Sequence, residues 1–156
     1  MRVKLVNPFY AKTVLLAQFA LTWMLVGLIW FVQLVHYPLM GNVGVESFVR
    51  YETLHRDFIG PLVAPLMMAE GLTALMLVAT MKSEPGRWKA WLGIVLLIVI
   101  WGSTFFWQVP LHERLTAGFE EAVQAELVHS NWIRTLAWTA RGVLLFAVVN
   151  QRCELR

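Results

Sequence analysis

The chain has 156 residues, of which 58% are hydrophobic and 15% charged, and its mean hydropathy is +0.61. A soluble domain of this size could not bury so much apolar surface, so we expect one domain, residues 1–156, in a lipid bilayer. The formal net charge of +3 comes from Lys and Arg near the ends of apolar runs, which favours membrane orientation over nucleic-acid binding. Cys153 is the only cysteine, which excludes an internal disulfide and a cysteine zinc site.

Four apolar runs have about the 20 residues that a membrane-spanning helix needs. They predict an all-α, integral membrane four-helix bundle with spans over residues 13–36, 58–81, 90–109 and 132–150. The first run follows a basic segment without a convincing cleavage site, so we expect an uncleaved helix. Pro38 should stop the first helix before Tyr37, and Pro110 should lie at or near the end of the third.

The two long connections, residues 38–57 and 111–131, are predicted to be helical in their second halves. The segment 45–58 has apolar residues at near-helical spacing, and 119–131 contains no Gly or Pro. We therefore expect the second and fourth helices to extend beyond the bilayer.

The distribution of basic residues predicts the topology. One side is richer in Lys and Arg, so both termini should be cytoplasmic in an inner membrane, and the other side should face the periplasm. The richer side would hold Arg2, Lys4, Lys12, Lys82, Arg87, Lys89, Arg152 and Arg156. Aromatic residues that include Tyr37 would mark the outer interface.

All four histidines occur in a repeated pattern at the predicted outer ends of the helices. Gln33-x-x-His36 ends the first run and Glu52-x-x-His55 precedes the second. Gln108-x-x-x-His112 ends the third run and Glu126-x-x-His129 precedes the fourth. This order predicts an internal duplication that forms two similar helical hairpins with one metal site.

Residues three apart lie on one helix face, so each Glu-x-x-His pair could bind one ion. The two motifs resemble those of di-iron and di-manganese four-helix-bundle proteins, in which two further helices add glutamates. Here histidines stand in place of those glutamates. The predicted ligands are His36, Glu52, His55, His112, Glu126 and His129, with Gln33 and Gln108 orienting them.

This ligand set suits a transition metal, with two ions of iron, copper or zinc bridged by the glutamates as the preferred form. Manganese fits the same donors. A single zinc ion held by four histidines is simpler, and a bis-histidine haem would leave two histidines unexplained. The alternative without metal is that each histidine is only a polar residue at the membrane interface.

Three further charged residues lie in or beside the apolar runs, where charge usually faces a partner or a cavity. Glu70 and Arg141 should lie at similar depth and form an ion pair between the second and fourth helices. Arg134 lies two turns before Arg141 on the same helix face, and this stripe could hold an acidic head group. Glu70, Arg141 and Arg134 are therefore candidate catalytic or substrate-anchoring residues.

The leading functional hypothesis is a metal-dependent membrane oxidoreductase or oxygenase that acts on a lipophilic substrate from the bilayer. An open metal position would take dioxygen or water. A second hypothesis is a zinc or copper site that holds the bundle together in a protein that binds a partner. A third is a small transporter, for which a homo-oligomer would add polar groups along the path.

Overall fold

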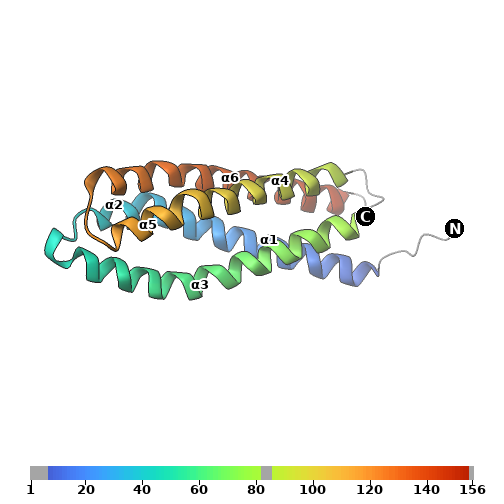
Figure 1. Cartoon of the computed structure of the whole chain (residues 1–156). Helices are drawn as coiled ribbons and strands as arrows, with labels where there is room; N and C mark the ends of the chain where they lie inside the picture. Colours follow the sequence, from blue (N-terminus) through green and yellow to red (C-terminus); the bar gives the residue numbers. More distant parts are fainter. Residues whose placement is uncertain (1–6, 82–85, 155–156) are drawn as a thin grey trace.

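The computed structural model describes residues 7–81 and 86–154, and every regular element in these ranges is helical. The elements follow one another as α1 (Pro8–Phe31), η1 (Val32–His36), α2 (Tyr37–Met40), α3 (Val45–Thr80), α4 (Arg87–Ser103), η2 (Thr104–Gln108), α5 (Val109–Leu115) and α6 (Glu121–Glu154). They form four rods in an elongated bundle, with α1–η1–α2 and α4–η2–α5 each continuous (Figure 1).

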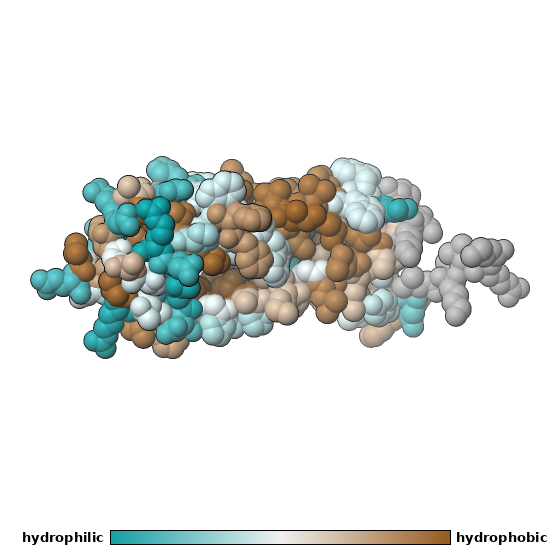
Figure 2. Space-filling view, viewed as in Figure 1, coloured by the Kyte–Doolittle hydropathy of each residue, from teal (hydrophilic) through white to brown (hydrophobic). Residues whose placement is uncertain are grey.

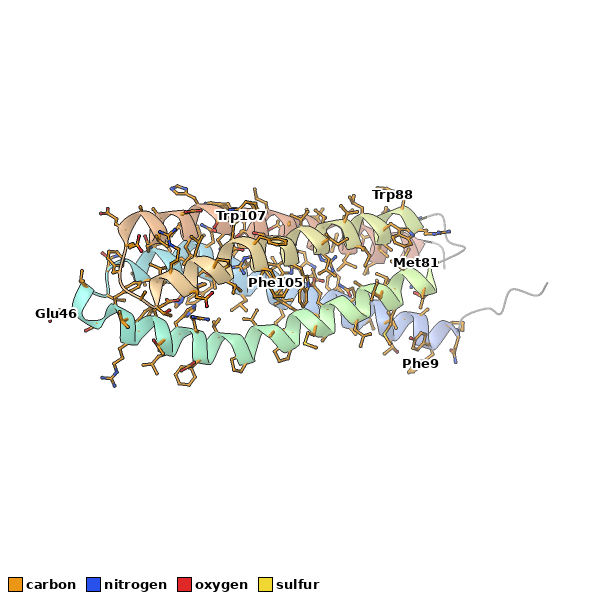
Figure 3. The ribbon with its side chains drawn as sticks, in the orientation of Figure 1. Phe9, Glu46, Met81, Trp88, Phe105 and Trp107 are labelled. Atoms are coloured by element: carbon orange, nitrogen blue, oxygen red, sulfur yellow. The ribbon has the colours of Figure 1, made fainter. Side chains whose placement is uncertain are left out.

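Each of the four rods is long and apolar enough to cross a membrane, consistent with an integral membrane protein. These stretches run over Pro8–Met40, Val45–Thr80, Arg87–Leu115 and Glu121–Arg152. In the view of Figure 2, hydrophobic side chains cover the middle of the molecule, and hydrophilic ones gather at the end that carries α2 and α5. Glu46 lies at the tip of this end (Figure 3).

The first and third rods continue past their prolines, where the sequence had predicted helix ends. In η1 and η2 the backbone widens to a π-helix, and the N–H groups of Tyr37 and Val109 bond to Val32 and Thr104, five residues back. Pro38 and Pro110 follow at the start of α2 and α5. Because proline has no N–H and its ring crowds the carbonyl four residues back, a widened turn ahead of it lets the helix continue.

The second and fourth rods are continuous helices of 36 and 34 residues, which confirms the predicted helical halves of both long connections. Pro61 and Pro65 lie inside α3 without ending it. A sharp turn separates α2 from α3, and Gly44 at its end has φ of 86°, a conformation that glycine adopts without strain. Of the basic residues used to predict topology, Arg2, Lys4, Lys82 and Arg156 lie outside the described residues.

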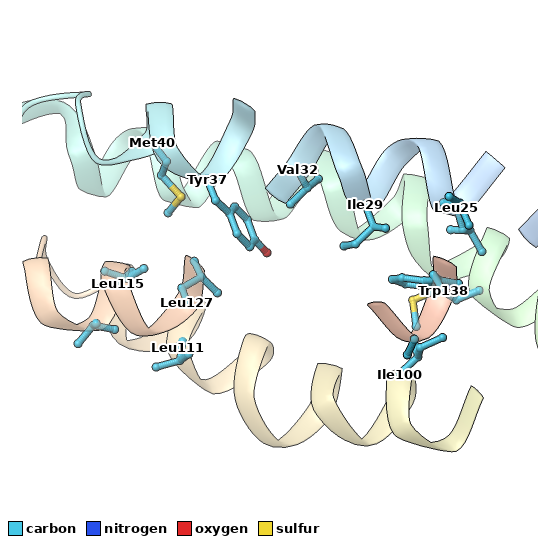
Figure 4. Close-up of a cluster of buried hydrophobic side chains, with 14 of the residues drawn as sticks. Leu25, Ile29, Val32, Tyr37, Met40, Ile100, Leu111, Leu115, Leu127 and Trp138 are labelled. Atoms are coloured by element: carbon cyan, nitrogen blue, oxygen red, sulfur yellow. The ribbon is translucent and has the colours of Figure 1, made fainter. Parts of the chain in front are cut away.

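The core consists of two groups of buried apolar side chains. The larger group lies in the half of the bundle that carries α2 and α5 and includes Leu25, Ile29, Ile100, Leu127 and Trp138. The smaller group lies near the end of the bundle at which α1 begins. Figure 4 shows the Tyr37 hydroxyl directed inward among the side chains of the larger group.

The sequence predicted that Tyr37 faces the membrane interface, and this prediction is wrong, because only 3% of the residue is exposed. The helix that continues past His36 turns the Tyr37 ring into the bundle. The inward-facing ring places the Tyr37 phenol group beside the predicted metal site.

Candidate functional site

Three of the four histidines meet between α3, α5 and the end of the first rod. His36 Nε2 lies 3.0 Å from His55 Nδ1, and the rings of His55 and His112 have centroids 5.1 Å apart. Each imidazole comes from a different rod, as the sequence pattern predicted for a shared site. The fourth histidine, His129, is exposed on α6 and takes no part in this cluster.

Glu52 supplies the carboxylate of the cluster and is completely buried. Its Oε1 atom lies 2.6 Å from His112 Nδ1. Its Oε2 atom has no hydrogen-bond partner. Among the described residues, it is the only buried side-chain N or O atom without one. An unpartnered carboxylate oxygen is costly to bury, which marks this position as one with spare ligand capacity.

The predicted six-ligand set is not assembled, because the two Glu-x-x-His motifs face different ways. Both Glu126 and His129 lie on the exposed face of α6. The buried face of that helix follows Val123, Leu127 and Asn131, a four-residue repeat from which Glu126 and His129 are offset. In α3 the corresponding repeat runs through Phe48 and Glu52, so this motif points into the bundle.

The structure therefore brings together His36, Glu52, His55 and His112. In the described ranges, no three His, Cys, Asp or Glu side chains are already arranged to hold a metal ion. The two close contacts, His36 with His55 and Glu52 with His112, use the same atoms that would face an ion. Two histidine nitrogens bound to one ion at about 2.0–2.1 Å lie about 3 Å apart when they subtend roughly a right angle. The 3.0 Å spacing of the His36–His55 pair is that of an N–H···N hydrogen bond, and it is also compatible with both nitrogens binding one ion.

Beyond His112 the hydrogen bonds continue to Tyr37 and Arg134. The Tyr37 hydroxyl lies 2.9 Å from His112 Nε2, and an Arg134 Nη2 group donates to the same hydroxyl at 3.3 Å. His112 thus has a carboxylate on one ring nitrogen and a phenol on the other. Tyr37 was missed as a site residue, although its place directly after His36 could have indicated it.

Gln33 and Gln108 are buried, as expected of supporting residues, but their amides bond to neighbours other than the histidines. The Gln33 amide donates to the Val128 carbonyl and accepts from Asn131. The Gln108 amide donates to Ser130 and accepts from Ser103. Both glutamines therefore connect a π-helical turn to α6.

An apolar cavity of about 260 Å³ lies beside the cluster. His55, His112, Tyr37, Arg134, Thr104 and Gln108 supply polar groups to its wall, which is otherwise mainly aliphatic and aromatic. Its wall on one side includes Gly60 and Ala64 of α3 and Phe105 of η2, all exposed on the outer surface of the bundle. Figure 3 shows Phe105 on the side of η2 toward α3. The cavity therefore opens sideways, between these two rods.

The predicted Glu70–Arg141 ion pair is confirmed, at 3.1 Å. Glu70 is completely buried and also accepts hydrogen bonds from Thr22 and from the Trp138 indole. Arg141 also donates to the Gly93 carbonyl. These partners connect α1, α3, α4 and α6, so the pair has the contacts of a structural clasp.

In comparisons with known proteins, no protein family, no curated protein and no solved structure matches the chain.

Proposed function

We propose that this protein is an integral membrane oxidoreductase that binds a transition-metal ion at the outer end of its bundle and acts on a lipophilic substrate. The observation that carries the proposal is the His36–His55 nitrogen spacing of 3.0 Å beside an apolar cavity. Imidazole nitrogens at this spacing from two separate rods can bind one iron, copper or zinc ion.

Glu52 or His112 would complete the ligand set. Glu52 has an unpartnered oxygen, while His112 has both ring nitrogens engaged. Binding through either residue would exchange their mutual hydrogen bond for coordination of the ion. The four side chains support one ion, because the glutamate and histidine expected for a second lie on the exposed face of α6. A redox-active ion held here would exchange electrons with the substrate.

The cavity is the proposed substrate site. Its apolar wall would bind a lipophilic molecule, and its opening toward the outside of the bundle would admit that molecule from the bilayer. His55 and His112 supply part of its polar wall. A substrate in the cavity would therefore lie next to the metal ligands and would exclude water from them.

The predicted topology belongs to the same proposal. Both termini would be cytoplasmic and the histidine cluster would lie at the periplasmic interface. The continuous α3 has 36 residues, and at about 1.5 Å per residue it is about 54 Å long, well over the roughly 30 Å of the hydrocarbon core. We place its first turns, and those of α6, outside the hydrocarbon core.

Metal analysis of purified protein tests the proposal. We expect about one iron or copper ion per chain in the wild type, with optical features that change on reduction. His55→Ala should lose the ion, while His129→Ala, which removes an exposed histidine of the same motif type, should retain it. Equal loss in both variants would contradict the ligand set, and a metal-free wild type that stays metal-free after incubation with each ion would overturn the proposal.

A second candidate function is structural: the histidine cluster would only hold the helices together, and its existing hydrogen bonds favour this role. The His36–His55 and Glu52–His112 hydrogen bonds already connect the first rod to α3 and α3 to α5 without an ion. One bound zinc, or no metal together with a large loss of stability in His55→Ala, would identify this role.

A further inference from the structure

Arg134 is a buried cation without a counter-ion in the described part of the chain. Arg134 is 8% exposed, and its closest hydrogen-bond partners are two neutral groups. Nε and Nη2 donate to the Asn131 amide oxygen at 2.9 and 2.5 Å, and Nη2 also donates to the Tyr37 hydroxyl at 3.3 Å. No Asp or Glu among the described residues lies within ion-pair distance of it, whereas Arg141, two turns along α6, has Glu70.

The Nη1 group of Arg134 has the greatest unused donor capacity. Its one partner is the Thr104 hydroxyl at 3.4 Å, a long and weak hydrogen bond. Arg134 and Thr104 both line the apolar cavity. A guanidinium buried without a negative partner carries a large desolvation cost, and an anion in the cavity would offset it.

The neighbours of Arg134 hold its side chain in place. Asn131 lies one turn before it on α6, accepts from the guanidinium and donates its own amide to Gln33 at 2.8 Å. Gln33 is anchored in turn by the Val128 carbonyl. Asn131 and Gln33 are thus positioning residues that fix the guanidinium before any ligand arrives.

From this arrangement we propose that the cavity binds a lipophilic monocarboxylate, with its carboxylate on Arg134 and its apolar chain along the cavity. The single cation matches one negative charge, and a guanidinium can donate two parallel hydrogen bonds to a carboxylate. The Tyr37 hydroxyl and His112 lie beside the head group. The apolar tail would contact Leu25, Ile29, Val63 and Met67 and reach the lateral opening.

This inference names the substrate class for the cavity of the proposed function, and it does not depend on the metal ion. Equilibrium dialysis of purified protein in nonionic detergent at about pH 8, where a carboxylic acid is ionised, tests it with labelled decanoate and with decanol as the uncharged analogue. We expect the wild type to bind decanoate about tenfold or more tightly than decanol, the range of a charge-assisted hydrogen bond.

Arg134→Gln should lose this preference while still binding decanol, and Arg134→Lys should retain part of it. Arg114→Gln, which removes an exposed arginine in an exposed ion pair, is the matched control and should bind like the wild type. Ala64→Phe, at the exposed opening, should weaken both ligands together because it fills the route of the tail.

Equal binding of decanoate and decanol by the wild type would overturn the inference without any variant. An unchanged decanoate affinity in folded Arg134→Gln would also overturn it, as would tighter binding of decanol. Metal content measured on the same samples separates the two proposals: decanoate binding by metal-free protein supports this inference alone, while metal binding without a decanoate preference supports only the metal site.

Discussion

The carboxylate of Glu52 lies 2.6 Å from the imidazole of His112 and is completely enclosed by the bundle. This contact joins α3 to α5 and leaves one carboxylate oxygen without a partner. It sets Glu52 apart from Glu126, the other glutamate in a Glu-x-x-His motif, which is exposed.

Glu52→Ala should therefore destabilise the bundle, because it leaves the His112 Nδ1 group without its partner. We expect a loss of about 1–3 kcal/mol in the free energy of unfolding, the usual cost of an unsatisfied buried polar group. Denaturant unfolding of chelator-treated protein would measure it. Glu126→Ala is the matched control and should change stability by less than about 0.5 kcal/mol. A similar loss in both variants would show that the two glutamates are equivalent.

The Glu70–Arg141 pair should contribute to stability and not to metal binding. Glu70→Gln keeps the shape of the side chain but leaves Arg141 buried without a counter-charge, which should cost about 3 kcal/mol or more. The metal content of this variant should equal that of the wild type. Adding Arg141→Met should recover part of the lost stability, because no charge then remains unpaired.

A double-mutant cycle measures this coupling. Thermal unfolding of the two single variants and the double variant should show a double loss smaller than the sum of the single losses. Strict additivity would mean that the ion pair contributes nothing. Loss of metal in Glu70→Gln with stability unchanged would instead assign the pair to function.

Gly142 of α6 leaves room for the Trp23 side chain of α1. A Cβ atom at this position would lie 3.2 Å from two atoms of the Trp23 ring, whereas one at Gly27 would meet nothing within 4 Å. Gly142→Leu should therefore cost about 1–3 kcal/mol of stability through overpacking. Gly27→Leu is the control, since it brings the same gain in helix propensity without the clash. Equal thermal stability of the two variants would contradict this packing.

The proposed orientation can be checked with reporter fusions. A green fluorescent protein fused after Arg156 should fluoresce, because the terminus is expected in the cytoplasm. Alkaline phosphatase inserted between Asn42 and Val43, in the turn before α3, should be active because that turn is expected in the periplasm. The reverse pattern of activities would invert the topology and place the histidine cluster at the cytoplasmic face.

The sequence was sufficient to predict the helical class and the approximate extent of the four rods. Long apolar runs leave few alternatives, because a backbone in a bilayer must satisfy its own hydrogen bonds. The ion pair of Glu70 and Arg141 was also predictable, since two opposite charges at matching depth in apolar segments each need a partner. The pattern of Glu52, His55, His36 and His112 identified residues that do meet.

The tertiary structure decided which residues of that pattern face inward. The sequence spacing of Glu126 and His129 equals that of Glu52 and His55, but rotation of α6 about its axis, set by the packing of Val123, Leu127 and Asn131, turns them outward. The widened turn before Pro38 likewise places Tyr37 inside the bundle. Spacing along a chain fixes which residues share a helix face, but only packing against the other helices fixes where that face points.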